Sequence, residues 1–321
     1  MTQTLSQPTF YETEADWLAS RQGCIGASEV ATILGGNPHK SPHAFWCQKA
    51  GLLPPDDTNL AMRRGHHMEP FIASLYTETT GNAVYDPGDF TVWSHPDMPF
   101  FRCTPDRLLC DDGMPVELKD IGHYISQQVR EDGEPPITYQ AQVQAQIAIL
   151  GAEQADLACF MDGRDFEVFR VQRNDRFIKA MLAEVAEFYE RLQNGDPPPV
   201  DGHPSTAAAI AALHPDDNGE TVTLPREAIE AAMALDIAKA RIKELEAEKA
   251  RHENVLKAAI GNATFGEGPD LRFSWKTQER TGYLRLADTP EARATLAQYG
   301  LAYTETQSSK FRVLRALKAR A

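Results

Sequence analysis

Residues 104–119 combine two acidic segments with a turn between them, and no other part of the chain constrains the fold as strongly. Thr104-Pro105-Asp106 precedes the turn Asp111-Asp112-Gly113, and Val116-Glu117-Leu118-Lys119 follows it. Apolar runs on both sides of the turn predict a β-hairpin. Because side chains alternate along a strand, Glu117 and Lys119 share one face. If Asp106 lies on the adjacent strand, two carboxylates and one amine meet at one place.

This set of side chains is suited to metal-assisted hydrolysis of a phosphodiester. Two carboxylates can hold a hard divalent cation such as Mg²⁺, and the lysine can position a water or offset negative charge on the phosphate. The pattern is short, however, and the alternative is a surface hairpin with an exposed Glu–Lys pair that contributes little to stability. Three further segments bear on the choice.

The first segment runs from Arg63 to Tyr76 and ends near Gly81. Its apolar residues recur at helical spacing, and Pro70 suits the first turn of a helix. Glu69 is then expected near the helix N-terminus, where a third carboxylate joins the cation site. Alternatively, Glu69 only offsets the helix dipole.

The second segment, residues 139–147, follows two prolines and precedes Gly151, which predicts a helix of about three turns. Tyr139, Gln142 and Gln146 fall on one face, and Val143 and Ile147 fall on another that reads as core. The polar stripe can orient the lysine or the attacking water, or it can simply face solvent.

The third segment, residues 21–31, has two glycines and then Ser28 before an apolar run. This order predicts a loop that enters a helix with Ser28 as its N-cap. Free N–H groups at a helix start favour a phosphate, and Arg21 adds positive charge. The alternative is an ordinary cap with a surface arginine nearby.

Taken in order, these segments resemble the YqaJ viral recombinase family, the lambda-exonuclease type of PD-(D/E)xK nucleases. The resemblance covers roughly the first two thirds of the chain. It implies an α/β fold with a restriction-endonuclease-like core, in which helices flank a central mixed sheet. The matching motifs are Arg-x-Gly-x-Ile-Gly-Ala-Ser-Glu-Val at 21–30, Gly-x-x-x-Glu at 65–69, Thr-Pro-Asp at 104–106, Glu-Leu-Lys at 117–119 and Tyr-x-Ala-Gln-Val-Gln at 139–144.

The resemblance also implies roles for individual residues. It places two Mg²⁺ ions, for which Mn²⁺ substitutes, on Asp106, Glu117 and the Leu118 carbonyl, with Glu69 close by. Lys119 becomes the catalytic lysine, and Gln142 contacts the catalytic centre. The terminal 5′ phosphate of the DNA is assigned to Arg21, Ser28 and Tyr139. Family members often have Cys-Pro after the lysine, whereas this chain has Asp120-Ile121.

The implied activity is Mg²⁺-dependent, 5′-to-3′ degradation of one strand of double-stranded DNA from its ends. The resulting 3′ overhang would serve a single-strand annealing protein in phage-type recombination, and the resemblance implies a homo-oligomer, a ring-shaped trimer. One alternative is an endonuclease of the same fold that nicks or resolves structured DNA. Another is a DNA-binding assembly module without activity, against which the complete Asp106, Glu117 and Lys119 set argues.

Net charge and cysteine content bear on DNA binding and on the compartment in which the protein works. The formal net charge of −14 disfavours nonspecific DNA binding, although residues 261–321 carry ten Lys/Arg against six Asp/Glu and are therefore locally positive. The five cysteines have no metal-binding or disulfide spacing, which suits a reducing compartment. With no apolar span or signal peptide visible, we expect the cytoplasm of a bacterial host, with a phage or prophage origin and no membrane partner.

Three regions are expected along the chain. Residues 1–197 read as the nuclease domain, with short strands at 90–93, 100–103, 106–109, 115–119, 156–160 and 166–171 and a helix at 175–193. Residues 198–224 read as a linker with a short helix at 205–213. Residues 225–321 read as an extension for oligomerisation or DNA contact, made of a long helix at 225–260 with partial heptad spacing and a small α+β part. In that part, strands at 271–275 and 311–314 flank a helix near 290–299.

Overall fold

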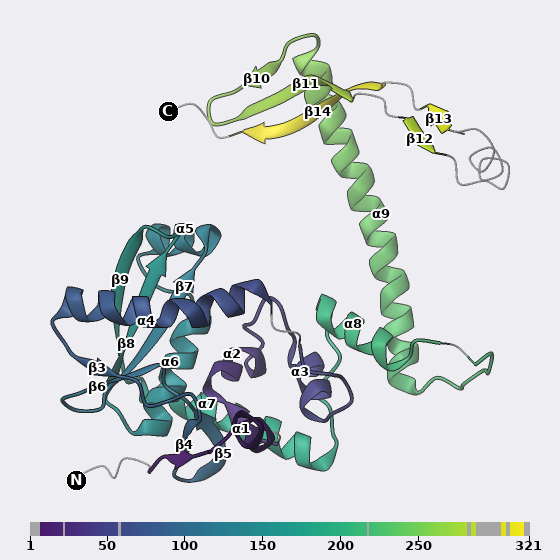
Figure 1. The fold of residues 1–321 in the computed structure, drawn as a ribbon. Coiled ribbons are helices and arrows are strands. Elements are labelled where there is room, and N and C mark those ends of the chain that lie inside the picture. The colour runs from purple at the N-terminus through teal and green to yellow at the C-terminus, as the bar shows by residue number, and fades with distance from the viewer. Residues whose placement is uncertain are drawn as a thin grey trace, which may run out of the picture. The chain divides into compact units, whose positions relative to one another are not determined.

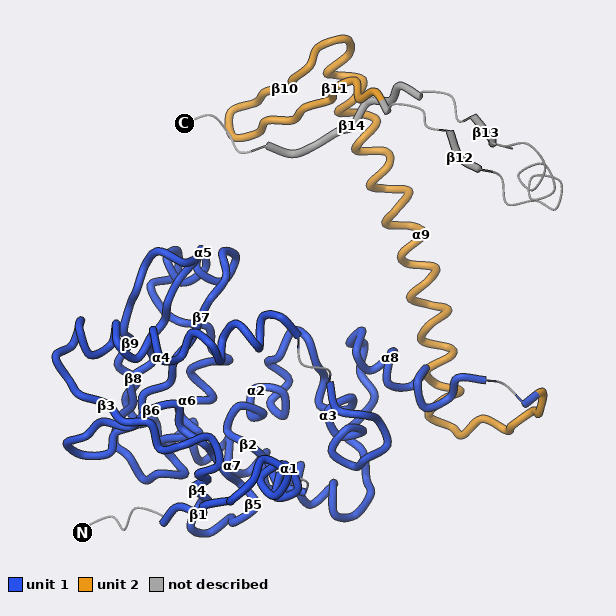
Figure 2. Tube along the Cα trace, in the orientation of Figure 1, with its two compact units in different colours: residues 1–218 blue, residues 219–321 orange. Residues whose placement is uncertain are grey.

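The structure, a computed structural model, describes residues 7–21, 23–56, 59–216, 218–280, 284–286, 303–305 and 309–317. It divides the chain into two compact units, residues 1–218 and 219–321 (Figure 1 and Figure 2). The boundary falls inside the segment read as a linker, and the earlier part of that segment contributes helix α8 to unit 1. Among the described helices, none is long and apolar enough to cross a membrane.

Unit 1 contains eight described α-helices, a short 3₁₀ turn and two sheets. The helices are α1 (Glu14–Arg21), α2 (Val30–Ile33), α3 (Pro42–Lys49), α4 (Leu60–Thr80), α5 (His123–Asp132), α6 (Ile137–Leu150), α7 (Asp175–Asn194) and α8 (Pro204–Leu213), and the 3₁₀ turn is η1 (Ala27–Glu29). The strands are β1 (Thr9–Phe10), β2 (Ile25–Gly26), β3 (Val84–Tyr85), β4 (Thr91–His95), β5 (Met98–Cys103), β6 (Arg107–Leu109), β7 (Pro115–Ile121), β8 (Gln154–Met161) and β9 (Asp165–Gln172).

The central sheet has the order β3-β6-β7-β8-β9, and a second sheet has the order β1-β4-β5-β2. In the central sheet β7 and β8 are parallel while the other pairs are antiparallel, so the sheet is mixed. The predicted hairpin is present as β6 and β7, which pair through Arg107 and Val116. The parallel β7–β8 pair requires a crossover, and α5 and α6 provide it.

Helices cover both faces of the central sheet, so both faces of β7 are covered. Val116 and Leu118 pack with Ile72 and Tyr76 of α4 on one face. On the other face, Ile121 belongs to a larger core built with α6 and α7. Strand alternation therefore directs Glu117 and Lys119 toward α6. This is the arrangement expected of a restriction-endonuclease-like core.

Helix α4 begins ten residues earlier than the sequence analysis expects. Asn59 caps the helix by accepting a hydrogen bond from Met62 N, and Pro70 lies inside the helix instead of in its first turn. The prediction that Glu69 lies near a helix N-terminus is therefore wrong. Pro70 lacks an N–H and leaves one backbone carbonyl of the preceding turn without its helical partner, a cost that the helix tolerates. Packing of Ile72 and Tyr76 on the sheet stabilises the helix around it.

Unit 2 consists of helix α9 (Arg226–Ile260) and strands β10 (Phe265–Glu267), β11 (Arg272–Arg280), β12 (Leu284–Leu286), β13 (Tyr303–Glu305) and β14 (Ser309–Leu317). The strands form a three-stranded sheet, β10-β11-β14, and the pair β12-β13. The long helix and the two longest strands appear where the sequence predicts them. The helix expected near 290–299 lies outside the described residues.

Candidate active site

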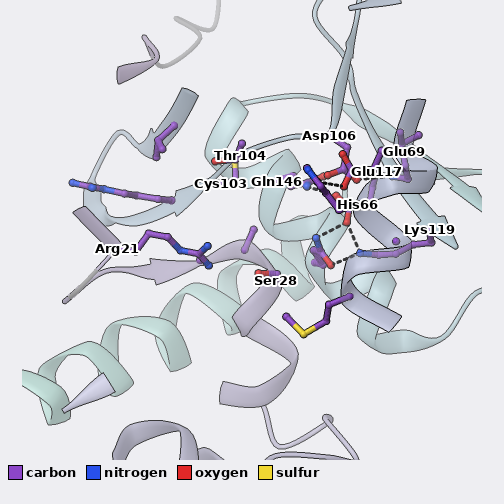
Figure 3. Close-up of a pocket in the computed structure, with 18 of the residues that line it drawn as sticks. Arg21, Ser28, His66, Glu69, Cys103, Thr104, Asp106, Glu117, Lys119 and Gln146 are labelled. Carbon is purple, nitrogen blue, oxygen red and sulfur yellow. Dashed lines mark hydrogen bonds and ion pairs between the residues drawn. The ribbon is translucent and has the colours of Figure 1, made fainter. Parts of the chain in front are cut away.

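Glu117 of β7 is the centre of the site and is almost fully buried, with 2% of its surface exposed. Its Oε1 accepts hydrogen bonds of 2.5 Å from Lys119 Nζ and from Gln142 Nε2. Its Oε2 accepts one of 2.5 Å from Gln146 Nε2. Figure 3 shows Gln146 and Lys119 converging on this carboxylate. An unpartnered buried carboxylate is costly, so this dense set of donors is what allows a charge at this depth.

Helix α6 supplies both glutamines because its polar face lies against β7. Gln142 and Gln146 are one helical turn apart, so both side chains reach Glu117. Gln142 Oε1 also accepts a hydrogen bond of 3.1 Å from Lys119. The interpretation of this stripe as a solvated face is therefore wrong, since Gln146 is only 1% exposed.

Asp106 lies in the loop just before β6, and its Oδ2 accepts a hydrogen bond of 2.8 Å from the backbone N–H of Leu118. It lines the same cavity as Glu117 and Lys119. Burial raises the pKa of Asp106 well above its ordinary value, and the neighbouring Glu117 raises it further, while Lys119 partly opposes both. The expected convergence of Asp106, Glu117 and Lys119 is present in the structure.

Lys119 remains charged despite its position. Burial by itself would lower its pKa, but the charges of Glu117 and Asp106 more than offset burial, so the pKa is raised. The ring of Tyr139 lies 5.4 Å from Nζ, on α6. When both carboxylates are ionised they outweigh the single ammonium, and a divalent cation would relieve the repulsion between them.

Other predicted residues lie around this centre. Glu69 lines the cavity and is 3.3 Å from His66 Nδ1, and burial raises its pKa. Leu118 also lines the cavity. Asp120 Oδ2 accepts a hydrogen bond of 2.6 Å from Arg64 Nε of α4, so this carboxylate forms an ion pair with α4.

The opposite wall of the cavity is basic. Arg21 and Ser28 lie on this side (Figure 3). Lys49 and Arg102 also line the cavity. Arg21 stacks on the Trp17 ring at 4.8 Å and has no carboxylate partner within the described part of the chain. A planar guanidinium without a carboxylate partner can bind a phosphate through two parallel hydrogen bonds.

Ser28 does not cap a helix as expected. It lies in η1, whose cap is Gly26, and the Glu29 carboxylate accepts the Gly26 N–H at 2.7 Å. Glu29 also pairs with Lys49 at 2.9 Å. Helix α2 begins only at Val30, with Glu29 at its cap position and no side-chain cap bond, and the exposed Ser28 lines the cavity.

Some residues that line the cavity carry no signal in the sequence, and one predicted site residue does not line it. Tyr139, predicted to bind the 5′ phosphate, contacts Lys119 and is not among the residues that line the cavity. Lys49 and Arg102, which line the basic wall, carry no motif that marks them. Gln146 belongs to the polar stripe that the sequence predicts could orient the lysine or the attacking water, but it has no individual role there, although its spacing from Gln142 is the signal that could have assigned one.

The oxygen atoms at the centre of the site suit a hard cation as ligands. The described residues include no group of three or more His, Cys, Asp or Glu side chains arranged to hold a metal ion. The acidic pair Asp106 and Glu117 would need further oxygen ligands, such as the Leu118 carbonyl, Glu69 or water. Oxygen ligands of this kind are those that Mg²⁺ prefers. The buried Oε1 of Gln146 also lacks a hydrogen-bond partner in this region, which suits an acceptor for a bound water.

Solved structures share this fold. The chain matches an alkaline exonuclease, LHK-Exo, from Laribacter hongkongensis, at 26% identity and a TM-score of 0.50, over 57% of this chain and 94% of that one. The same exonuclease in complex with dAMP matches at 25% identity and a TM-score of 0.51, with the same coverage. A protein of Bacillus subtilis strain 168 described as uncharacterised, YqaJ, is 26% identical over 266 residues, which is 81% of this chain and 82% of its own length.

The α/β core and the acidic pair with its lysine define the class of the protein: a nuclease with a restriction-endonuclease-like fold. Residues 16–153 match the family model described as the YqaJ-like viral recombinase domain. The match spans the part of the chain that holds the five motifs, and the resemblance inferred from them is confirmed.

Proposed function

We propose that the protein is a Mg²⁺-dependent deoxyribonuclease that degrades one strand of double-stranded DNA from a 5′ end and leaves a 3′ single-stranded overhang. One observation carries the proposal. A single cavity has Asp106, Glu117 and Lys119 on one wall and the unpaired Arg21 on the other. The first wall has the equipment for phosphodiester hydrolysis, and the second can hold the phosphate of a strand end.

Each residue then has a definite task. Asp106 and Glu117, with the Leu118 carbonyl and Glu69, hold two Mg²⁺ ions. When bound, Mg²⁺ activates the attacking water and stabilises the leaving 3′ oxygen. Lys119 donates hydrogen bonds to the water or the scissile phosphate and offsets its charge. Gln142 and Gln146 hold the Glu117 carboxylate in one orientation through the bonds to its two oxygens.

The basic wall selects the end of the strand. Arg21 and Ser28 bind the terminal 5′ phosphate, and Arg102 adds positive charge in the same cavity, whereas Lys49 is paired with Glu29. An enzyme that removes one nucleotide at a time must accommodate a nucleoside monophosphate in its site. The complex of LHK-Exo with dAMP supports this reading.

The family match supports a role in phage-type homologous recombination. We propose that the overhang is passed to a single-strand annealing protein, that the enzyme works as a homo-oligomer, a trimer by resemblance, and that it acts in the cytoplasm of a bacterial host. Mn²⁺ is expected to replace Mg²⁺, because both accept oxygen ligands in octahedral geometry.

The test compares a linear duplex with 5′ phosphates and a covalently closed circle of the same sequence, each with Mg²⁺ and with EDTA. We expect Mg²⁺-dependent loss of the linear DNA and an intact circle. Rapid cutting of the circle would favour an endonuclease instead. Lys119→Ala should reduce cleavage at least about a hundred-fold while the protein stays folded, and Lys179→Ala, an exposed lysine of α7, serves as the control. Equal activity in the two variants would refute the assignment.

A further inference from the structure

Helix α9 has an exposed apolar seam that nothing in the proposed catalytic function uses. The helix runs over 35 residues, about 52 Å at 1.5 Å per residue. Leu235, Ile242 and Leu245 are 53%, 55% and 54% exposed. They belong to positions a and d of a heptad pattern whose apolar residues are interrupted by Lys249 and His252. The complete set is Ala228, Ala231, Leu235, Ala238, Ile242, Leu245, Lys249, His252, Leu256 and Ala259.

A parallel partner of the same sequence would fit this seam badly. Each seam residue would meet its own copy, so Ala231 and Ala238 would meet alanines and leave gaps. Lys249 would meet Lys249, and His252 would meet His252. Like charges and gaps in the seam both destabilise a coiled coil.

An antiparallel partner fits the seam well. When position a of one helix faces position d of the other about a centre between Lys243 and Glu244, Ile242 packs on Leu245 in the two central layers. Two of the outer layers pair a large side chain with a small one: Leu256 with Ala231 and Lys249 with Ala238. Leu235 faces His252, and Ala228 faces Ala259. This centre is also the midpoint of the helix, so the two copies overlap over their full length.

The charges flanking the seam agree with the antiparallel alignment. In that alignment Arg241 faces Glu248 and Lys239 faces Glu246, which gives four attractive pairs by symmetry, without a like-charge pair between flanking positions. In the parallel alignment Arg241 faces Glu246, but Glu248 faces Glu253. The existing contacts within the helix, His252 to Glu248 at 3.6 Å and Lys239 to Asp236 at 3.9 Å, are exposed and therefore weak competitors.

We propose that α9 is an interface between copies of this chain, in which two α9 helices pair as an antiparallel coiled coil centred between Lys243 and Glu244. The proposal concerns unit 2 and does not depend on the nuclease activity. It commits to a second copy because the self-complementarity of seam and charges requires the same sequence on both sides.

Disulfide trapping in the full chain tests the direction of pairing. In a background with Cys110→Ser, which removes the exposed native thiol, Leu235→Cys and His252→Cys are made in two differently tagged chains. Mild oxidation should crosslink the mixture of the two variants but neither variant alone. Crosslinking of each variant with itself would indicate a parallel pair. Absence of crosslinks in every sample would overturn the proposal.

A charge exchange tests the register without cysteines. Arg241→Glu should raise the dissociation constant of self-association at least about five-fold, because two attractive pairs become repulsive. Combining it with Glu248→Arg in the same chain should restore association. Arg251→Glu, at an outer position of the helix, is the matched control and should have little effect. Analytical ultracentrifugation at low salt gives the constants, and failure of the double exchange to restore association would contradict the register.

Discussion

Gln146 donates a 2.5 Å hydrogen bond to Oε2 of Glu117, and its own carbonyl oxygen is buried without a partner among the described residues. The bond fixes which way the amide points, because a reversed amide would place its oxygen against a carboxylate. The two glutamines of α6 then leave Glu117 little freedom to rotate. Positioning of a charged group before the reaction lowers the barrier by avoiding reorganisation later.

We expect Gln146→Leu to reduce the rate constant of DNA cleavage by about ten- to a hundred-fold, with a small change in KM. The substitution removes the hydrogen bond that orients Glu117. It removes no group that is proposed to contact the DNA, so KM should change little. Single-turnover cleavage at saturating DNA measures the effect. Gln144→Leu is the matched control, since Gln144 is also buried in α6 but bonds to Gln172 and Asn174 away from the site. An equal loss in both variants would point to a general defect of α6.

Replacing one carboxylate of the acidic pair should abolish Mg²⁺ binding without unfolding the protein. Asp106→Asn keeps an acceptor for the Leu118 N–H and removes one of two neighbouring buried carboxylates. The variant should therefore unfold at an equal or higher temperature than the parent in EDTA, and should lose the increase in unfolding temperature that Mg²⁺ gives the parent. Thermal unfolding with and without Mg²⁺ measures both. A Mg²⁺ response that survives in the variant would contradict the metal assignment.

The same residue predicts a pH dependence in the absence of metal. The pKa of Asp106 is raised in the folded state from its ordinary value of 3.8, so the folded state binds more protons than the unfolded state above that pH. Stability of the metal-free protein should then fall as the pH rises from about 4 toward the folded-state pKa. Asp106→Asn should remove this contribution. Urea unfolding in EDTA at several pH values measures the slope, and equal slopes in parent and variant would contradict the prediction.

End recognition should depend on Arg21. Arg21→Ala removes the guanidinium that faces the cavity without a carboxylate partner in the described chain. The preference for 5′-phosphorylated over 5′-hydroxyl ends, as a ratio of kcat/KM values, should fall by about ten-fold or more, since charge-assisted bonds to phosphate are strong. Arg176→Ala, an exposed arginine of α7, should keep the parent's preference. An unchanged ratio in Arg21→Ala would place the end-binding group elsewhere.

A buried group far from the chemistry predicts alkaline instability. Tyr76 of α4 donates a 2.6 Å hydrogen bond to Asp156 of β8. Burial and this carboxylate raise the pKa of Tyr76 from 10 to about 12. The unfolded state ionises first, so the stability is complete below pH 10 and is lost as the pH rises toward 12, by up to about 3 kcal/mol. Tyr76→Phe should be less stable at pH 8 by about 1 kcal/mol and show a shallower loss above pH 10, measured by urea unfolding.

Much of the architecture followed from local patterns. The amphipathic spacing in residues 175–193 predicts α7 almost to its ends, since Asn174 caps it and Gly195 stops it. Alternation around Glu117 predicts β7 and puts Glu117 and Lys119 on one face. These features depend on nearest neighbours in the chain, so sequence spacing is enough to find them.

Other features depended on segments that are distant in sequence. Local signals predict that α4 begins near Pro70, because proline favours the first turn of a helix. The helix begins at Leu60 instead, and the packing of Ile72 and Tyr76 on the sheet stabilises it. Residue type favours Ser28 as the cap, yet it lies inside η1, where Glu29 accepts the Gly26 N–H and pairs with Lys49 of α3. Neither outcome can be read from a window of adjacent residues.

The sequence by itself determined which chemical groups this protein has and their order: the acidic residues 106 and 117, the lysine at 119, the glutamines of the later helix and the arginine at 21. Only the tertiary structure decided that these groups share one cavity and which glutamine binds which oxygen of Glu117. It also decided that Tyr139 contacts the lysine and does not line the cavity. The physical reason is that spacing in a strand or helix sets the direction of a side chain relative to its own element. The partners it meets are set by how the sheet and helices pack, and that packing is cooperative over the whole unit.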